Sequence, residues 1–509
     1  MSVFRFIITF FRGNIPGGPW LLLILLGMFT IILWFVVRTS GMIEPRRVRQ
    51  ILVQGWAILI VGYFVVWTVT KPEALPKTLL VTPFADQTVE GWIGEALADA
   101  VGERLAYADS EVHLIPWEVC PSFESDLGAD SIWVQVKKLQ PTFAVWGSVW
   151  GRADSLWMEF YGARTSWGRT VRFSPYKRRY KSLDEAAAGV VELTKTATLI
   201  PWHGSESRVV RSRPIEALGK YYSAKRQLRR GRWEAAQDLA AQAIAIDSTW
   251  SEAWALEGVA IEHAGEAPAQ AVSVYVKALE IDSSDISNWH YYATYAIRRH
   301  QWDLAANCLK AAYHLQRKNP VTLFLLSHLR ESRVVSISNL SSEQALELAL
   351  RLHPGYLDAR LKLVRNYCDQ GNLRKSRRLI QAGLDLYPVS WELWELLSNV
   401  DIREKKFGNA LTAIRRSIQL GDDRPSILYN AGLVYFYLDS LSQARSFLTQ
   451  SAALGATSNG YYLLGRCAER QGDSTAARGY YRKCIERATG DDDEVVREAR
   501  KKIGIESQE

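Results

Sequence analysis

The sequence predicts a multi-domain membrane protein with two transmembrane helices, a small α+β domain and an all-α repeat solenoid. Three observations lead to this fold class. Two uncharged apolar runs lie within the first seventy residues, strand-like and helix-like segments alternate between residues 77 and 200, and from Ala217 the sequence repeats at a period near 34. At 509 residues the chain is long enough for several domains.

Composition and charge restrict the functional classes. Hydrophobic residues make up 48% of the chain and charged residues 23%, which excludes wholesale disorder. Lys and Arg total 62 against 54 Asp and Glu, and the formal charge of +8 is well below that of a dedicated nucleic-acid binder of this length. The five cysteines are widely spaced, which matches neither a disulfide framework nor a zinc site.

Residues 1–76 are predicted to form a membrane anchor. Residues 20–37 and 51–69 are apolar runs of about 18–19 residues, long enough to cross a hydrocarbon core. The loop between them holds a dense group of arginines at positions 38, 46, 47 and 49. Since positive loops stay in the cytoplasm, both termini and the bulk of the chain are expected on the far side, which in a bacterium is the periplasm. The outer flanks carry as many basic residues over a longer stretch, so the cytoplasmic face remains the alternative.

Residues 77–200 are predicted to form a small α+β domain. Its segments follow in the order β-α-β-α-β-β-β-α. The expected strands are residues 78–84, 112–116, 142–150, 155–163 and 169–174, and the expected helices are residues 90–106, 131–139 and 183–197. About 120 residues are enough for one hydrophobic core.

Two short segments of this domain resemble a known family. The run Leu79-Leu80-Val81-Thr82-Pro83-Phe84 leads into a helix, and the run AVWGSV at residues 144–149 leads into a hairpin. In this order they are similar to the amino-terminal domain of TolB and its CsgG-like relatives, although Ala85–Thr88 is shorter than the polar run that relatives have there. The resemblance covers about a quarter of the chain. It implies a non-catalytic interaction domain of the bacterial envelope, which agrees with the bulk of the chain lying on the periplasmic side of a bacterial inner membrane.

From Ala217 onward, small residues, aromatic residues and prolines recur at a period near 34. The clearest unit covers residues 251–285, with Trp254 and Gly258 in its first helix and Ala271 and Ala278 in its second. This pattern resembles the tetratricopeptide repeat family. The resemblance implies about eight stacked units over residues 217–491, after a linker at 201–216 and before a capping helix and tail at 492–509. The unit at residues 320–356 is irregular.

A partner-binding groove is expected along the first helices of these units. In tetratricopeptide arrays, fixed positions of each first helix face the groove, and the resemblance implies the same here. At or near these positions stand Tyr221, Tyr222, Lys225, His290, Tyr291, Arg298, His328, Lys362, Arg365, Asn399, Tyr429, Asn430, Tyr437, Tyr462 and Arg466. This basic, tyrosine-rich wall suits an extended acidic or aromatic segment of a partner protein. A hydrated concave surface without a partner is the alternative.

Nothing in the sequence points to catalysis. There is no Gly-rich phosphate loop, no H-E-x-x-H, no G-x-S-x-G and no paired-cysteine metal spacing. No catalytic, cofactor-binding or metal-binding residue is therefore predicted, and no cofactor is expected. Residues 203–207 bring His, Ser and Glu together, but in a linker, where side chains are rarely preorganised. Cys467 and Cys484 belong to one unit and are interpreted as small packing residues.

Two dense basic clusters have three interpretations. They cover residues 176–181 (YKRRYK) and 225–232 (KRQLRRGR). Each can be a solvated surface, a site for anionic lipid headgroups, or a nucleic-acid site, and the last is disfavoured outside the cell.

Together these features predict a membrane-anchored scaffold or adaptor that binds partner proteins through its groove and its TolB-like domain. Such a protein would organise or assemble a membrane or cell-envelope complex. The expected partners are protein subunits of that complex and membrane lipid, and nucleic acid is not expected. A sensor or regulatory subunit of a membrane signalling system is the first alternative, since TolB-like domains joined to such repeats also occur in membrane sensors. An enzyme with an unrecognised site is the second.

Overall fold

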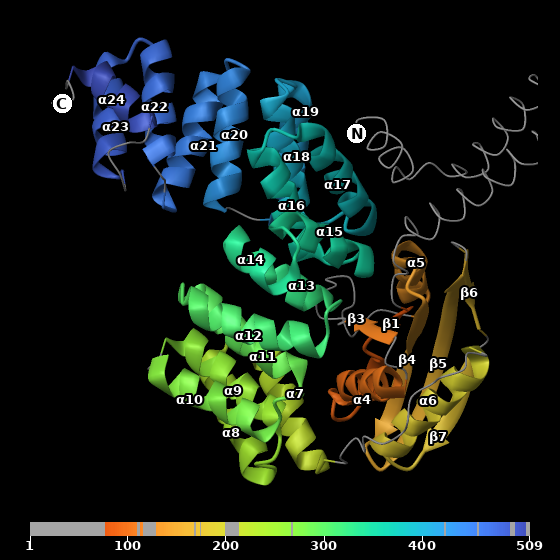
Figure 1. Cartoon of the computed structure of the whole chain (residues 1–509). Coiled ribbons are helices and arrows are strands. Elements are labelled where there is room, and N and C mark those ends of the chain that lie inside the picture. Colours follow the sequence, from red (N-terminus) through yellow and green to blue (C-terminus); the bar gives the residue numbers. More distant parts are fainter. Residues whose placement is uncertain are drawn as a thin grey trace, which may run out of the picture. The chain divides into compact units, whose positions relative to one another are not determined.

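The computed structural model describes residues 77–108, 112–115, 129–166, 169–173, 175–198, 213–265, 268–421, 424–455, 458–488 and 494–504. Both predicted transmembrane segments, residues 20–37 and 51–69, lie outside this part of the chain. Among the helices that are described, none is both long enough and apolar enough to cross a membrane. The described chain consists of a small α/β domain and a helical solenoid (Figure 1).

A mixed sheet is the scaffold of the α/β domain. In the described part it has seven strands in the order β3-β1-β4-β5-β6, with β2 beside β4 and β7 beside β5. The pairs β1–β3, β1–β4 and β2–β4 are parallel, whereas β5 runs antiparallel to β4, β6 and β7. The strands are β1 (Lys77–Val81), β2 (Ala85–Thr88), β3 (Val112–Ile115), β4 (Phe143–Arg152), β5 (Ser155–Ser166), β6 (Arg169–Arg172) and β7 (Tyr176–Tyr180).

Three helices cover the sheet, and alternating side chains decide which face each one covers. Val145, Val149 and Met158 are fully buried on the face where α4 (Ile93–Ala108) and α6 (Leu183–Thr198) pack. Ala144 and Trp146 point to the opposite face and pack with α5 (Ala129–Leu139). Because successive residues of a strand point to opposite faces, the central strand β4 must be apolar on both sides.

The structure adds two strands, β2 and β7, to those expected from the sequence. β2 has only four residues, ADQT, and none of them is fully buried. β7 lies within the basic cluster YKRRYK, and only Tyr180 of its five residues is buried. This strand pairs with β5 at the sheet edge, and because four of its five residues are exposed it shows no alternation of hydrophobic and polar residues. The sequence pattern therefore gave no signal for it.

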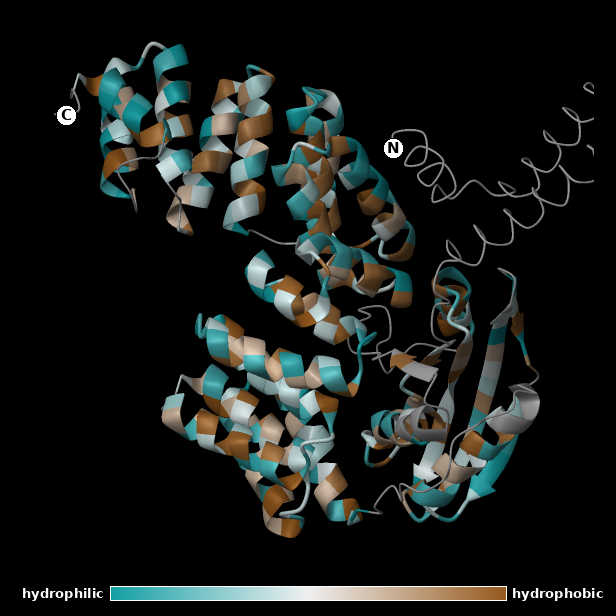
Figure 2. Cartoon of the chain, viewed as in Figure 1, coloured by the Kyte–Doolittle hydropathy of each residue, from teal (hydrophilic) through white to brown (hydrophobic). Residues whose placement is uncertain are grey.

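Paired antiparallel helices build the solenoid. The pairs are α7 (Ile215–Arg229) with α8 (Trp233–Ile246), α9 (Ser251–Ala264) with α10 (Pro268–Ile281), α11 (Ile286–Arg298) with α12 (Trp302–Leu315), α16 (Leu357–Asp369) with α17 (Leu373–Leu386), α18 (Trp391–Arg403) with α19 (Phe407–Gly421), α20 (Pro425–Tyr437) with α21 (Leu441–Ala453), and α22 (Ser458–Arg470) with α23 (Ser474–Glu486). The irregular unit contains α13 (Pro320–Leu326), α14 (Glu331–Ser338) and α15 (Ser342–Leu352). Helix α24 (Glu494–Ile503) packs on the last pair. Hydrophobic and hydrophilic residues interleave along these helices, as expected of helices that bury one face (Figure 2).

Glycines permit close approach within the pairs. A Cβ atom added at Gly258 in α9 would lie 2.7 Å from Cε1 of Tyr275 in α10. Gly465 in α22 and Tyr481 in α23 repeat this arrangement at 2.5 Å. Any larger residue at either glycine must therefore push the two helices apart.

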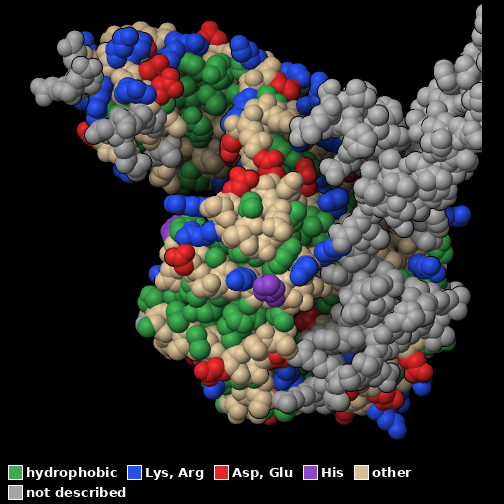
Figure 3. Space-filling model, in the orientation of Figure 1, with side chains coloured by type: hydrophobic (Ala, Val, Ile, Leu, Met, Phe, Trp, Pro, Cys, Tyr) green, Lys and Arg blue, Asp and Glu red, His purple; other side chains and the backbone are tan. Residues whose placement is uncertain are grey.

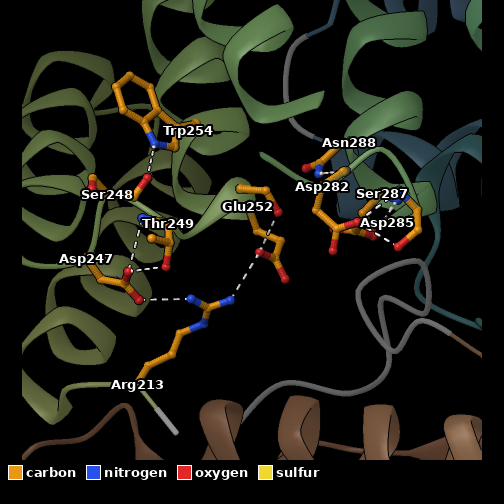
Figure 4. A network of polar contacts seen from close by, with 12 residues as sticks. Arg213, Asp247, Ser248, Thr249, Glu252, Trp254, Asp282, Asp285, Ser287 and Asn288 are labelled. Atoms are coloured by element: carbon orange, nitrogen blue, oxygen red, sulfur yellow. Dashed lines mark hydrogen bonds and ion pairs between the residues drawn. The ribbon is translucent and has the colours of Figure 1, made fainter. Parts of the chain in front are cut away.

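The loops between units share a polar turn (Figure 4). The side chain of Asp247 accepts hydrogen bonds from the backbone N–H and the hydroxyl of Thr249, and the indole N–H of Trp254 donates to the carbonyl of Ser248. The next loop repeats these bonds with Asp282, Ser283, Ser284 and Trp289. Arg213 joins the first loop to α9 through ion pairs with Asp247 at 2.9 Å and Glu252 at 3.7 Å.

Candidate partner-binding groove

A pocket of about 600 Å³ lies between the first helices of three consecutive units, α16, α18 and α20. Two of the predicted groove residues, Arg365 and Asn399, line it. The other lining residues are Cys368, Asp369, Trp391, Glu395, Leu396, Ile402, Arg403, Ser426 and Leu433. The pocket therefore combines apolar, cationic, acidic and amide side chains.

Arg365 and Asn399 stand one repeat apart, at the same position of neighbouring units. Arg365 is exposed and Asn399 is half-buried. Within the described part of the chain, neither side chain forms a hydrogen bond or an ion pair. A guanidinium and an amide are thus available to a ligand on the pocket wall.

Two carboxylates, which were not among the predicted groove residues, give the pocket a mixed charge. Burial raises the pKa of Glu395, and its Oε1 atom accepts a hydrogen bond at 3.0 Å from Nδ2 of the predicted groove residue Asn430. Asp369 forms an ion pair with Arg403 at 3.8 Å. Helical spacing could have identified both carboxylates. Glu395 lies four residues from Asn399, and Asp369 lies four residues from Arg365, so each is on the same helix face as a predicted groove residue.

Two predicted groove residues that precede Arg365 in the sequence, His328 and Lys362, contact each other across neighbouring units. Nζ of Lys362 in α16 lies 3.2 Å from Nδ1 of His328. Burial, with the charge of Lys362, lowers the pKa of His328 to about 4. Burial also lowers the pKa of Lys362, together with the nearby charge of Arg365. The lowered pKa favours the neutral ring of His328, whose Nδ1 can accept a hydrogen bond from the Lys362 ammonium group.

Two predicted groove residues of the third unit, His290 and Arg298, contact side chains of the neighbouring units. Nε2 of His290 lies 2.7 Å from the hydroxyl of Thr322, and burial lowers the pKa of His290 to about 3. Arg298 lies 2.8 Å from Nε2 of His263 and 3.4 Å from a carboxylate oxygen of Glu262. Tyr291, the third predicted groove residue of this unit, is half-buried.

In the first unit, the predicted groove residues Tyr222 and Lys225 contact helix α4 of the α/β domain. The hydroxyl of Tyr222 donates to Oδ2 of Asp99 at 2.8 Å, and Nζ of Lys225 lies 3.4 Å from the same oxygen. The Tyr222 ring also stacks on Trp92, with centroids 6.1 Å apart. Tyr221 lies beside them and is fully enclosed, which raises its pKa well above the ordinary value. The chain itself thus covers this end of the groove.

A second ion pair strengthens this contact. Nη2 of Arg229 donates to both carboxylate oxygens of Glu95, at 2.6 and 2.7 Å. Glu95 is buried, whereas Arg229 retains partial exposure. The cations of the basic cluster at residues 225–232 that contact α4 are therefore paired with acids of the same chain.

A second, apolar contact joins the α/β domain to the solenoid near the pocket. Ile132 and Val136 of α5 belong to one hydrophobic cluster with Leu361 of α16 and Leu384 of α17. Nζ of Lys138 donates to the carbonyl of Asp385 at 2.8 Å. The α/β domain thus contacts the first unit through α4 and the fifth through α5.

The last predicted groove residues line α20 and α22. Tyr437 is 50% exposed and its ring stacks on Phe407 at 4.7 Å, while burial raises the pKa of its neighbour Tyr429. Tyr462 donates a hydrogen bond to Glu498 of α24, and Arg466 donates to the Tyr462 hydroxyl at 3.1 Å. The capping helix therefore engages this end of the groove.

The surface charge of the solenoid is also mixed. Figure 3 shows one face, on which Lys and Arg are interspersed with Asp and Glu instead of forming one continuous basic surface. Among the described residues, no group of three or more His, Cys, Asp and Glu side chains is arranged to hold a metal ion.

Two segments of the solenoid, residues 361–425 and 458–490, match models of the tetratricopeptide repeat. The solenoid contains tetratricopeptide repeats. The first segment includes the pocket helix α18 and most of α16, and the second includes α22 and α23. Tetratricopeptide repeats generally mediate protein–protein interactions, and the repeat fold is typically non-catalytic. No curated protein matches the sequence.

Three solved structures resemble the chain at TM-scores under 0.5. A crystal structure of APC/C hetero-tetramer Cut9-Hcn1 has a TM-score of 0.43 at 12% identity, over 56% of this chain and 55% of that one. A human IFIT1 dimer with PPP-AAAA has 0.42 at 18% identity, over 57% and 74%. A crystal structure of MamA has 0.27 at 20% identity, over 31% and 92%. The chain thus spans about half the length of the first of these, and likeness at this level implies no function.

Proposed function

We propose that the chain is a membrane-anchored scaffold whose tetratricopeptide pocket between α16, α18 and α20 binds a segment of a partner protein. One observation carries this proposal. Arg365 and Asn399 present polar groups on the wall of a pocket of about 600 Å³ and have no hydrogen-bond partner in the described part of the chain. Arg residues beside aromatic and apolar side chains are common anchors of protein interfaces, and Trp391 and Leu433 supply the apolar lining.

The pair Arg365→Ala and Asn399→Ala tests this function. Arg374→Ala and Asn409→Ala form the matched control, because they remove the same two side chains from exposed positions on the second helices α17 and α19. Proteins that co-purify with the full chain from native membranes in mild detergent are compared. We expect at least one protein to be recovered with the parent and the control but lost with the pocket variant, since removing interface anchors costs about 1–4 kcal/mol of binding. Recovery of the same proteins by all three chains would refute the pocket as the binding site.

We further propose that residues 1–76 anchor the scaffold in a bacterial inner membrane, with the bulk of the chain in the periplasm. The two apolar runs and the arginines between them support this placement. A reporter that is active only in the cytoplasm, fused after Glu509, is expected to stay silent. Activity of that reporter would place the described domains on the cytoplasmic face instead.

The α/β domain is proposed to act as a TolB-like interaction domain that organises a cell-envelope complex. Its contacts with α7 and with α17 support a role in holding the solenoid in a fixed position relative to this domain. A scaffold needs such a fixed relation, because it must present its pocket at a defined place in the complex.

A further inference from the structure

One half of a sheet face in the α/β domain carries none of the described helices. On the face opposite α4 and α6, α5 packs near Ala144 and Trp146 of β4. Further along the same face, the ladder pairs Trp150 with Trp157, and Trp157 with Arg179. Trp157 is 42% exposed. We name this surface the tryptophan face, and it consists of Ser148, Trp150, Trp157, Glu159, Lys177 and Arg179.

The cations at this face have no acidic partners. Lys177 and Arg179 of β7 lie on this face and Arg152 lies at the end of β4, whereas Arg178 pairs with Met158 and points to the opposite face. Within the described part of the chain, the side chains of Arg152, Lys177 and Arg179 form no ion pair, and the Arg179 guanidinium donates hydrogen bonds to the hydroxyl of Ser155. Nζ of Lys177 lies 5.0 Å from the Trp150 ring centroid, and the Arg179 guanidinium lies 5.9 Å from that of Trp157. The aromatic rings and these cations therefore form one surface.

Protection of the sheet edge explains only part of this pattern. Charged residues on an edge strand discourage pairing with other chains, and β7 is an edge strand. Edge protection, however, does not require two tryptophans side by side on an open face. Exposed tryptophan beside Lys and Arg is typical of surfaces that lie at the membrane–water interface, where the indole sits among the headgroups.

The structure also separates the two basic clusters of the sequence. In the cluster at residues 225–232, two of the five cations, Lys225 and Arg229, form ion pairs with Asp99 and Glu95. In the cluster at residues 176–181, the cations remain unpaired and adjoin exposed aromatic rings. The second cluster, whose cations lie beside the Trp150 and Trp157 rings, therefore has the character of a lipid-binding surface.

We propose that the tryptophan face docks on the headgroup layer of anionic phospholipids. This inference rests on the proposed membrane anchorage of the same chain. Residues 70–76 separate the second apolar run from β1, and fully extended they span about 25 Å. With that anchorage, β1 begins within about 25 Å of the bilayer.

Photocrosslinking tests this docking in the full chain. A benzoylphenylalanine replaces Trp157, and in a control chain it replaces Val389, which is 66% exposed in the solenoid. Each chain is reconstituted in nanodiscs with or without phosphatidylglycerol, irradiated and analysed by mass spectrometry for lipid adducts. Each basic residue near an anionic surface contributes about fivefold to binding. We therefore expect at least about tenfold more adduct at position 157 than at 389, and only with phosphatidylglycerol.

Charge reversal sharpens the test. Lys177→Glu with Arg179→Glu is expected to reduce the adduct at position 157 at least about tenfold, whereas Arg374→Glu with Arg378→Glu on exposed solenoid positions leaves it unchanged. Both variants must retain the parent's circular dichroism spectrum. Equal adducts at 157 and 389, adducts that ignore lipid charge, or adducts to protein or nucleic acid at 157 would overturn the proposal. A chain that fails to enter nanodiscs would instead overturn the proposed anchorage.

Discussion

The first and the fifth units of the solenoid present the same side of their first helices to different surroundings. In α7, Lys225 contacts Asp99 of the α/β domain. In α16, Arg365 occupies the same position of its unit, but it borders an open pocket and has no ion pair in the described part of the chain. The α/β domain reaches both units, yet it covers the groove residues only of the first, because α4 meets α7 through acids and Trp92.

This difference shows that residue type alone does not make a groove position available. Lys225 and Arg365 are both cations at one repeat position, and their sequence contexts do not separate them. What separates them is a contact between residues 126 positions apart. A binding surface of this solenoid is therefore defined by what the α/β domain leaves uncovered.

The close packing of paired helices should be the same in units near the α/β domain and in units far from it. A bulky side chain at the packing glycines tests this expectation and has the largest expected effect. Gly258→Trp and Gly465→Trp each place an indole where Tyr275 or Tyr481 already lies within 2.7 Å of an added Cβ. Each should destabilise the chain by about 3 kcal/mol and loosen neighbouring units, because every unit depends on its stacking partner. Helical melting of the full chain in detergent measures the loss.

Gly408→Ala is the control, because an added Cβ there meets no atom within 4 Å. It should leave the melting curve unchanged or raise it slightly, since alanine favours helix. If either tryptophan variant melted like the parent, the paired helices would not approach as closely as the structure has them.

The contact that covers the first unit can be broken by charge reversal. Glu95→Lys would place a cation against Arg229, whose guanidinium now binds both oxygens of the buried carboxylate. Allowing for the partial exposure of Arg229, we expect a loss of about 2 kcal/mol. Hydrogen exchange should speed up in α4 and α7 but not in α18. Asp130→Lys, which removes a largely exposed partner of Arg172 in the same domain, should change exchange in α7 little.

Much of the repeat architecture can be predicted from the sequence, whereas the contact of α4 with the first unit cannot. Gly258, Gly465 and the alanines at matching positions reveal the units because the close approach of two helices requires small residues at a fixed spacing. The contact of Tyr222 with Asp99 joins residues 123 positions apart. It does not recur along the chain, so no periodic sequence pattern predicts it. The edge strand β7 was missed for a related reason, because only one of its five residues is buried.

The central units should respond to pH through histidines that bridge neighbouring helices. Burial holds the pKa of His290 at about 3, below its ordinary value of 6.5. Below pH 6.5 the unfolded chain therefore binds a proton that the folded chain does not, and stability falls as pH falls. Between pH 6.5 and about pH 5 this group should cost about 1–2 kcal/mol. Asp285 acts in the opposite direction, because burial raises its pKa to about 6 and stability rises as pH falls toward 3.8.

His290→Gln isolates the histidine contribution to this pH dependence. Glutamine keeps a polar group near Thr322 but does not titrate, so the variant should lose less stability than the parent between pH 6.5 and about pH 5. His314→Gln, at an exposed position of α12, should retain the parent's slope. Parallel slopes for all three chains would mean that His290 is not kept neutral by the fold.

The smallest predicted effects on stability come from alanine substitutions of Lys225 in the first unit and Arg365 in the fifth, and they compare the two units most directly. Lys225→Ala removes a half-buried partner of Asp99 and should cost about 1 kcal/mol, whereas Arg365→Ala removes an exposed side chain and should stay within about 0.5 kcal/mol. A double-mutant cycle with Asp99→Ala isolates the pair: Lys225 and Asp99 should show a coupling energy of about 0.5 kcal/mol or more, and Arg365 and Asp99 none. Both couplings are obtained from helical melting of the full chain in detergent. Equal costs and equal couplings at the two positions would mean that α4 does not cover the first unit, and that the open and covered halves of the groove are alike.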